Sequence, residues 1–190
     1  MRLFVGLAPP QAAADDLAAA CAPFRSARGD LRWTNRELWH VTLAFLGEVS
    51  AESLTRLLPR LDRAARRHQP PGLRLAGGGA FPGPGRANVL WSGLSGDRKG
   101  LGELAMSVSA GARRAGAPPP DEGRRYHPHL TLARCRMPAD VREIVARLSG
   151  YQGPAWTAGE IYLIQSVPGS KPHYERLHTC PVGTGGFMTG

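Results

Sequence analysis

The pentapeptide His-x-Thr-Leu-Ala occurs twice in this chain of 190 residues, beginning at His40 and again at His129. Each copy has the composition of a buried β-strand, and residues two apart on a strand share one face. Two such strands facing each other present two imidazoles and the hydroxyls of Thr42 and Thr131 to one small pocket. Histidine titrates near neutral pH, so this set of side chains suits acid–base chemistry on an anion.

The rest of the chain predicts alternating strands and helices, read from short apolar runs and from apolar residues at helical spacing. The expected order is β-α-β-β-α, then β-β-α, then β-α-β-β, with one motif strand in each half of the chain. This order predicts an α+β fold of two pseudo-symmetric lobes, in which two antiparallel sheets face each other across a central cleft and helices lie outside. Residues 1–182 are expected to form this single domain, and residues 183–190 a flexible tail.

The composition restricts the class of protein and of partner. Hydrophobic residues make up 42% of the chain, enough to bury a core, and the net charge is +9. A basic balance favours a polyanionic partner such as RNA, although an Arg-rich composition alone does not establish one. Three widely spaced cysteines, Cys21, Cys135 and Cys180, are typical of reduced thiols in a cytoplasmic protein. No apolar stretch has the length of a membrane span, and the first apolar run is too short for a signal peptide.

Further segments accompany the two motifs and carry a resemblance to a known family. They are Arg2–Val5, Trp39–Gly47, Gly79–Pro82, Val89–Trp91 and Tyr126–Arg134. In their order and spacing they resemble the 2H phosphoesterases over nearly the whole chain. The chain is most similar to the bacterial and archaeal RNA 2′,3′-cyclic phosphodiesterases, historically called 2′-5′ RNA ligases. Trp39 and Tyr126 depart from the Leu-like and Phe residues of the family, and neither departure touches the paired His and Thr.

The resemblance implies an enzyme that hydrolyses RNA 2′,3′-cyclic phosphate ends to 2′-phosphomonoesters, with no metal or other cofactor. The same site is expected to run in reverse and form a 2′-5′ linkage. The resemblance assigns His40 as proton donor and His129 as proton acceptor, a direction that the residues by themselves do not establish. It places Thr42, Thr131 and Arg134 on the phosphate oxygens. The expected partner is RNA with a cyclic end, bound by a cytoplasmic monomer that does not associate with membranes.

Strict alternation along the strands sets the expected facing of the neighbouring side chains. In the strand predicted over residues 38–47, Val41, Leu43 and Phe45 are expected on one face, and His40, Thr42 and Ala44 on the other. Alternation from His129 places Arg134 on the face opposite the motif residues, which conflicts with a phosphate contact. A strand end, a β-bulge or the length of the side chain must therefore redirect Arg134 toward the site.

Three alternatives stay open. The same site could act on a small cyclic nucleotide or an ADP-ribose cyclic phosphate, or the chain could be a non-catalytic module that binds RNA ends. His127 and His129 form a His-x-His pair that could bind zinc, although Pro128 distorts the strand and no third ligand is evident. Arg124 and Arg125 precede the second motif directly and are candidates for holding a polyanion.

Overall fold

The computed structural model describes residues 1–120, 125–169 and 173–184. Residues 185–190 of the expected C-terminal tail lie outside the described residues. Arg124, a candidate for holding a polyanion, also lies outside them. Within the described ranges, no helix is both long enough and apolar enough to cross a membrane.

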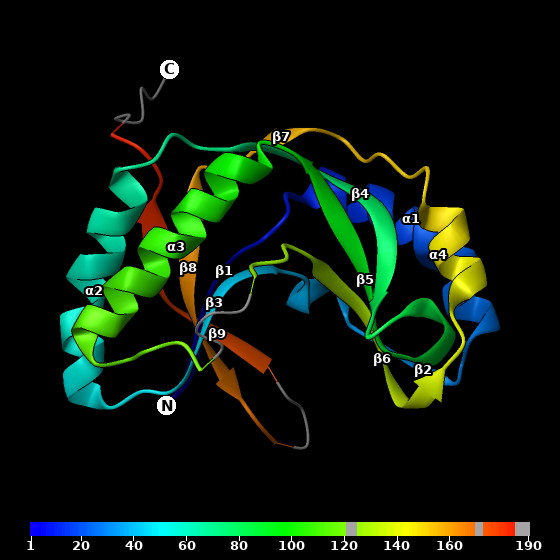
Figure 1. Ribbon diagram of the computed structural model, residues 1–190, viewed down its shortest axis with the longest axis horizontal. Helices are drawn as coiled ribbons and strands as arrows, with labels where there is room; N and C mark the ends of the chain where they lie inside the picture. The colour runs from blue at the N-terminus through cyan, green and yellow to red at the C-terminus, as the bar shows by residue number, and fades with distance from the viewer. Residues whose placement is uncertain (121–124, 170–172, 185–190) are drawn as a thin grey trace.

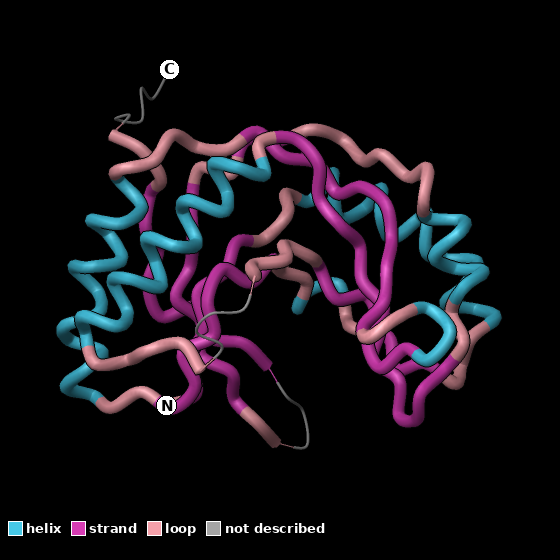
Figure 2. Tube along the Cα trace, viewed as in Figure 1, coloured by secondary structure: helices cyan, strands magenta, loops and turns pink. Residues whose placement is uncertain are grey.

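Four α-helices and nine β-strands are found in the described part of the chain, and they form two lobes (Figures 1 and 2). In chain order they are β1 (Arg2–Leu7), α1 (Gln11–Ala27), β2 (Leu31–Trp33), β3 (Val41–Glu48), α2 (Ala51–Arg66), β4 (Gly72–Phe81), β5 (Ala87–Gly96), α3 (Arg98–Ala115), β6 (Leu130–Ala139), α4 (Arg142–Leu148), β7 (Trp156–Thr157), β8 (Glu160–Val167) and β9 (His173–Pro181). The predicted α+β class with two lobes is confirmed.

All the strands belong to one curled sheet, in the order β7-β4-β5-β6-β3-β1-β8-β9, with β2 paired to β6. Every pairing is antiparallel, and the halves meet where β3 pairs with β6 through Val41 and Leu130. The two expected sheets are therefore joined at this point. Figure 1 shows α2 and α3 on the outside of one lobe and α1 and α4 on the outside of the other.

Local sequence explains the ends of the two helices that cover the first lobe. Ser50 accepts a hydrogen bond from the backbone N–H of Ser53 at the start of α2, and Asp97 accepts one from Gly100 at the start of α3. Gly116 ends α3 in the left-handed conformation (φ 81°), which glycine adopts without steric cost. Asp97 and Gly116 thus fix the two ends of α3. This helix packs beside β3, and the two elements line a pocket together.

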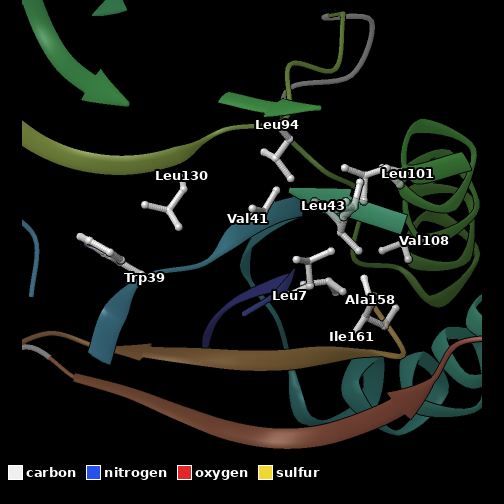
Figure 3. Packing of buried hydrophobic residues seen from close by; sticks show 14 of the residues in the cluster. Leu7, Trp39, Val41, Leu43, Leu94, Leu101, Val108, Leu130, Ala158 and Ile161 are labelled. Atoms are coloured by element: carbon white, nitrogen blue, oxygen red, sulfur yellow. The ribbon is translucent and has the colours of Figure 1, made fainter. Parts of the chain in front are cut away.

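The core lies behind the two motif strands (Figure 3). Val41 and Leu130, the pair that joins the lobes, are both completely buried, and Leu101 and Val108 of α3 are buried with them. Because side chains alternate along a strand, burying this pair turns the residues on either side of it to the opposite face. That face carries the motif histidines and threonines.

Candidate active site

The two motifs lie crosswise on neighbouring strands. Continuing the antiparallel register of β3 and β6 by one residue in each direction places His40 opposite Thr131 and Thr42 opposite His129. Directly opposed residues share one face of a sheet, and all four side chains are half-buried there. The structure thus brings together the four residues that the duplicated motif predicted, each histidine beside the threonine of the other motif.

Both imidazoles make the same backbone hydrogen bond. Nδ1 of His40 lies 2.7 Å from the carbonyl oxygen of Leu38, and Nδ1 of His129 lies 2.7 Å from that of His127. A carbonyl oxygen only accepts, so Nδ1 carries the proton in each neutral ring. This leaves Nε2 of both rings as the nitrogen that takes up or releases a proton.

Aromatic rings flank each imidazole. The ring centroids of Phe4 and Tyr174 lie 4.7 and 5.2 Å from that of His40, and the centroid of Phe81 lies 5.0 Å from that of His129. These contacts restrict the rotation of both imidazoles and shield them from water. Sequence reasoning did not place Phe4 or Tyr174 at the site, although Phe4 belongs to the first segment that carries the family resemblance.

The surroundings favour the neutral form of both histidines. Burial lowers the pKa of His40 below the ordinary value of 6.5, and the positive charges of His129 and Arg134 lower it further. The pKa of His129 is also lowered, first by burial and then by His127 and Arg134. In each case the hydrogen bond to a backbone carbonyl opposes the shift. Arg134 therefore acts electrostatically on both rings, which places it at the site.

A β-bulge explains how Arg134 reaches the motif face. Two consecutive residues of β5 pair with Thr131 and Ala133, so Leu132 is an extra residue in β6. Leu132 and Ala133 are both completely buried, and the alternation resumes one residue out of phase. Arg134 is consequently exposed on the side of the motif residues. Of the three explanations offered by the sequence, the bulge is the one that the structure contains.

The same irregularity occurs in β3 and reverses one expectation. Consecutive residues of β1 pair with Thr42 and Ala44, so Leu43 is the extra residue there. Leu43 and Ala44 are both buried, whereas Phe45 is 49% exposed. The prediction that Phe45 shares the face of Val41 and Leu43, with Ala44 on the opposite face, was therefore wrong. Phe45 stands five residues after its motif histidine, at the position that Arg134 holds in the other lobe.

The loop before the second motif is tied to the first. The hydroxyl of Tyr126 donates to the backbone carbonyl of Thr42 across 3.1 Å, and burial raises the pKa of this phenol, so it stays protonated. His127 is exposed, with its ring 4.9 Å from that of Trp91. The hydrogen bond connects the segment before β6 to β3 beside the motif residues, whereas the contact between His127 and Trp91 lies within the lobe of β5 and β6.

A metal ion at His127 and His129 lacks support from the surrounding side chains. Within the described ranges, three ligand-type side chains lie close enough together for an ion at Asp62, His178 and Cys180. That group lies between α2 and β9 and contains neither histidine of the His-x-His pair. The zinc alternative therefore still lacks a third ligand in the part of the chain that the structure describes.

Comparison with known proteins adds a family and named relatives. The model of the family described as LigT like Phosphoesterase matches residues 7–91, which contain the first motif. The RNA 2′,3′-cyclic phosphodiesterase of Archaeoglobus fulgidus is 34% identical over 73% of this chain and 76% of its own length. The protein of the same name from Aeropyrum pernix is 31% identical over 79% of this chain and 85% of its own.

A solved structure matches the whole fold. The crystal structure of E. coli LigT in its apo form superposes with a TM-score of 0.76 at 26% identity, covering 96% of this chain and 97% of that protein. A match of this extent includes both lobes and the sheet that joins them.

Proposed function

Because the chain belongs to the LigT-like phosphoesterase family, we propose that it opens RNA 2′,3′-cyclic phosphate ends to 2′-phosphomonoesters. The observation that carries this proposal is the crosswise placement of His40 and His129 on adjoining strands. Each ring is fixed through Nδ1 and keeps Nε2 for proton transfer. Two histidines with perturbed pKa values on one face are the arrangement that general acid–base catalysis needs, and binding alone does not require them.

In the proposed reaction, water attacks phosphorus in line with the bond to the ribose 3′ oxygen. His129 takes a proton from the water through Nε2, and His40 gives a proton to the departing 3′ oxygen. The new P–O bond forms as the P–O3′ bond breaks, and the product is a 2′-phosphomonoester with a free 3′-hydroxyl. Proton exchange with solvent then returns both rings to their starting states. The assignment of acid and base follows the family.

The remaining site residues are proposed to hold the phosphate. The hydroxyls of Thr42 and Thr131, one beside each histidine, donate to the non-bridging oxygens. Arg134 adds a charge-assisted hydrogen bond that strengthens as negative charge moves onto these oxygens. All these groups come from one chain, so a monomer suffices. Ligation, in which a 5′-hydroxyl attacks the cyclic end in place of water, uses the same two histidine roles. The 5′-hydroxyl gives its proton to His129, the departing 3′ oxygen takes one from His40, and ring strain supplies the driving force.

The proposed function is tested with a short RNA that ends in a 2′,3′-cyclic phosphate, incubated with the purified protein in excess chelator. We expect conversion to the 2′-phosphate at an undiminished rate, because no step needs a metal ion. The product is identified by its resistance to a 3′-specific phosphatase and by chromatography. Loss of activity in chelator, restored by zinc, would favour the His-x-His alternative. RNA that binds without turnover points to a binding module.

The pH profile of kcat/KM is expected to be bell-shaped, with its maximum below pH 6.5. The reactive form has one histidine protonated and one neutral, and it is most abundant between the two pKa values of the pair. Because both values are lowered, rising pH removes the acid's proton before neutrality, whereas falling pH protonates the base. Bound phosphate favours protonated rings, so kcat is expected to peak at higher pH. Initial rates measured across the acidic and neutral range check this prediction. A kcat/KM maximum above pH 6.5 contradicts it.

A further inference from the structure

A group of metal-binding side chains lies between α2 and β9, apart from the motif residues. Asp62 of α2 and His178 and Cys180 of β9 place their ligand atoms within 4.8 Å of one another. Nε2 of His178 lies 2.8 Å from Oδ1 of Asp62. The three residue types supply a carboxylate oxygen, an imidazole nitrogen and a thiolate sulfur, all of which are ligands of zinc in proteins.

A β-bulge turns the two ligands of β9 toward α2. Leu177 is an extra residue in β9, because consecutive residues of β8 pair with the residues on either side of it. Tyr174, before the bulge, packs against His40 on the face of the motif residues. After the bulge the alternation resumes out of phase, so His178 and Cys180 lie on the other face of the sheet. The metal-binding group is therefore separate from the candidate active site.

The surrounding backbone holds the three side chains together. α2 packs against β9 (Figure 1), and just after the strand the backbone N–H of Gly183 donates to the carbonyl oxygen of Ala65 in α2 across 3.1 Å. His178 and Cys180 are two residues apart and approach α2 side by side. Cys180 is completely buried, whereas the side chains of His178 and Asp62 are 29% and 32% exposed. A water molecule can therefore reach the group from its exposed side.

The distances and charges suit a zinc ion. Zinc bonds of about 2.0–2.3 Å put the ligand atoms of a tetrahedral site about 3.3–3.8 Å apart, so the separations here need to change by only about 1 Å. A thiolate and a carboxylate together balance the two positive charges of zinc. The occupied site therefore adds no net charge beside Arg66, whose positive charge acts on Cys180. Sulfur and imidazole ligands also favour zinc over magnesium and calcium, which prefer oxygen.

The thiol of Cys180 keeps its proton unless a cation replaces it. Burial, and then the nearby carboxylate of Asp62, raise the pKa of this thiol to about 12. A bound cation compensates the charge of the buried thiolate, so an S–Zn bond can take the place of the S–H bond. The thiol proton then passes to the solvent, and His178 binds in its neutral form.

We propose that Asp62, His178 and Cys180 bind one zinc ion, with a water molecule as the fourth ligand. The ion joins β9 to α2 and stabilises the packing of the helix on the sheet. It lies on the face of the sheet opposite to His40, so it takes no part in ring opening. This site is additional to the proposed function and does not depend on it.

Zinc binding is tested on protein that has been dialysed against a chelator and then freed of it, by titration with zinc in competition with a chromophoric chelator. Wild type is expected to bind one zinc ion per chain. Cys180→Ala and His178→Gln are expected to weaken binding by more than about 100-fold, because changing a residue outside the ligand set already costs about 10- to 100-fold. Cys21→Ala removes a buried thiol from α1, in the other lobe, and is the matched control.

Cobalt(II) in place of zinc reports the ligands directly. We expect the near-ultraviolet band of a cobalt-bound thiolate, with the strong visible absorption of tetrahedral cobalt, in wild type and Cys21→Ala but not in Cys180→Ala. Thermal melting gives a measurement that needs no variant. Free zinc at 100 times its dissociation constant is expected to raise the melting temperature of wild type by about 5–11 °C.

The proposal is overturned if wild type binds no zinc, or if Cys180→Ala binds zinc as tightly as Cys21→Ala does. His178→Gln replaces a partly exposed side chain and keeps the test decisive if Cys180→Ala does not fold. Ring opening is a separate measurement. Below the melting temperature, zinc-free wild type and His178→Gln are expected to open a cyclic-ended RNA at the rate of the zinc-bound protein. A protein that binds zinc at this group but opens no RNA end contradicts the proposed function alone.

Discussion

Alanine in place of His40 or His129 is expected to lower kcat for ring opening by about 10²- to 10⁴-fold, the usual contribution of one acid or base step. Binding of the cyclic end should weaken much less, because the phosphate contacts proposed for Thr42, Thr131 and Arg134 remain. Single-turnover rates on a cyclic-ended RNA, together with its dissociation constant, separate the two effects. The double variant should be little slower than either single variant, since the two groups act in one concerted step.

A matched control for these substitutions is His68→Gln. The imidazole of His68 bonds to the hydroxyl of Ser107 across 2.8 Å, in the packing between α2 and α3. It is a partly buried histidine with no proposed role, so its loss tests the general effect of removing an imidazole. Turnover by His40→Ala or His129→Ala at a rate near that of wild type, or an equal loss in the control, rules out the two-histidine mechanism.

Arg134→Ala is expected to produce the second largest loss, about 10²- to 10³-fold in kcat/KM, comparable to removing one oxyanion-stabilising donor. It should also move the pH profile. The positive charge of Arg134 lowers the pKa of both His40 and His129, so removing it lets both values rise. The alkaline limb of kcat/KM then shifts to higher pH. A purely structural role for Arg134 predicts a slower enzyme with an unshifted profile.

Two further variants sharpen the test of Arg134. Arg134→Lys keeps the charge and loses the forked geometry, so its pH profile should remain close to that of wild type while its rate falls. Arg147→Ala removes an exposed arginine from α4 in the same lobe and should leave both rate and profile unchanged. If Arg134→Lys shows the shifted profile, the electrostatic coupling to the two histidines is absent.

Much of the fold and of the candidate site was predictable because the His-x-Thr-Leu-Ala motif occurs twice in the sequence. One His-x-Thr strand is a common half-polar strand face, but a second copy, with matching flanks, indicated paired strands, two lobes and a phosphoesterase. The family expected from these segments is confirmed, as is the α+β class. The period of two along a strand was enough to place His40 with Thr42, and His129 with Thr131, because residues two apart share a face regardless of what the strand pairs with.

This rule could not predict on which face of the sheet Arg134 and Phe45 lie. A β-bulge depends on how two strands pair, and the sequence of one strand does not reveal its register with the partner strand. The extra residues Leu43 and Leu132 shift the phase of β3 and β6, burying two consecutive residues and turning the next one to the site. For Arg134 the resemblance indicated that some redirection was needed. For Phe45 no such signal existed, and alternation gave the wrong face.

The sequence by itself thus determined which groups do the proposed chemistry, because residue type and local spacing are properties of the chain. Tertiary structure alone decided what surrounds those groups. Tyr174 belongs to β9, which β1 and β8 separate from β3 in the order of the sheet, yet its ring packs against the imidazole of His40. Met106 of α3 and Phe45 of β3 meet in one pocket although they are far apart along the chain. Such contacts arise from the curl of the sheet and the packing of helices on it, which are set by the whole core and not by any local pattern.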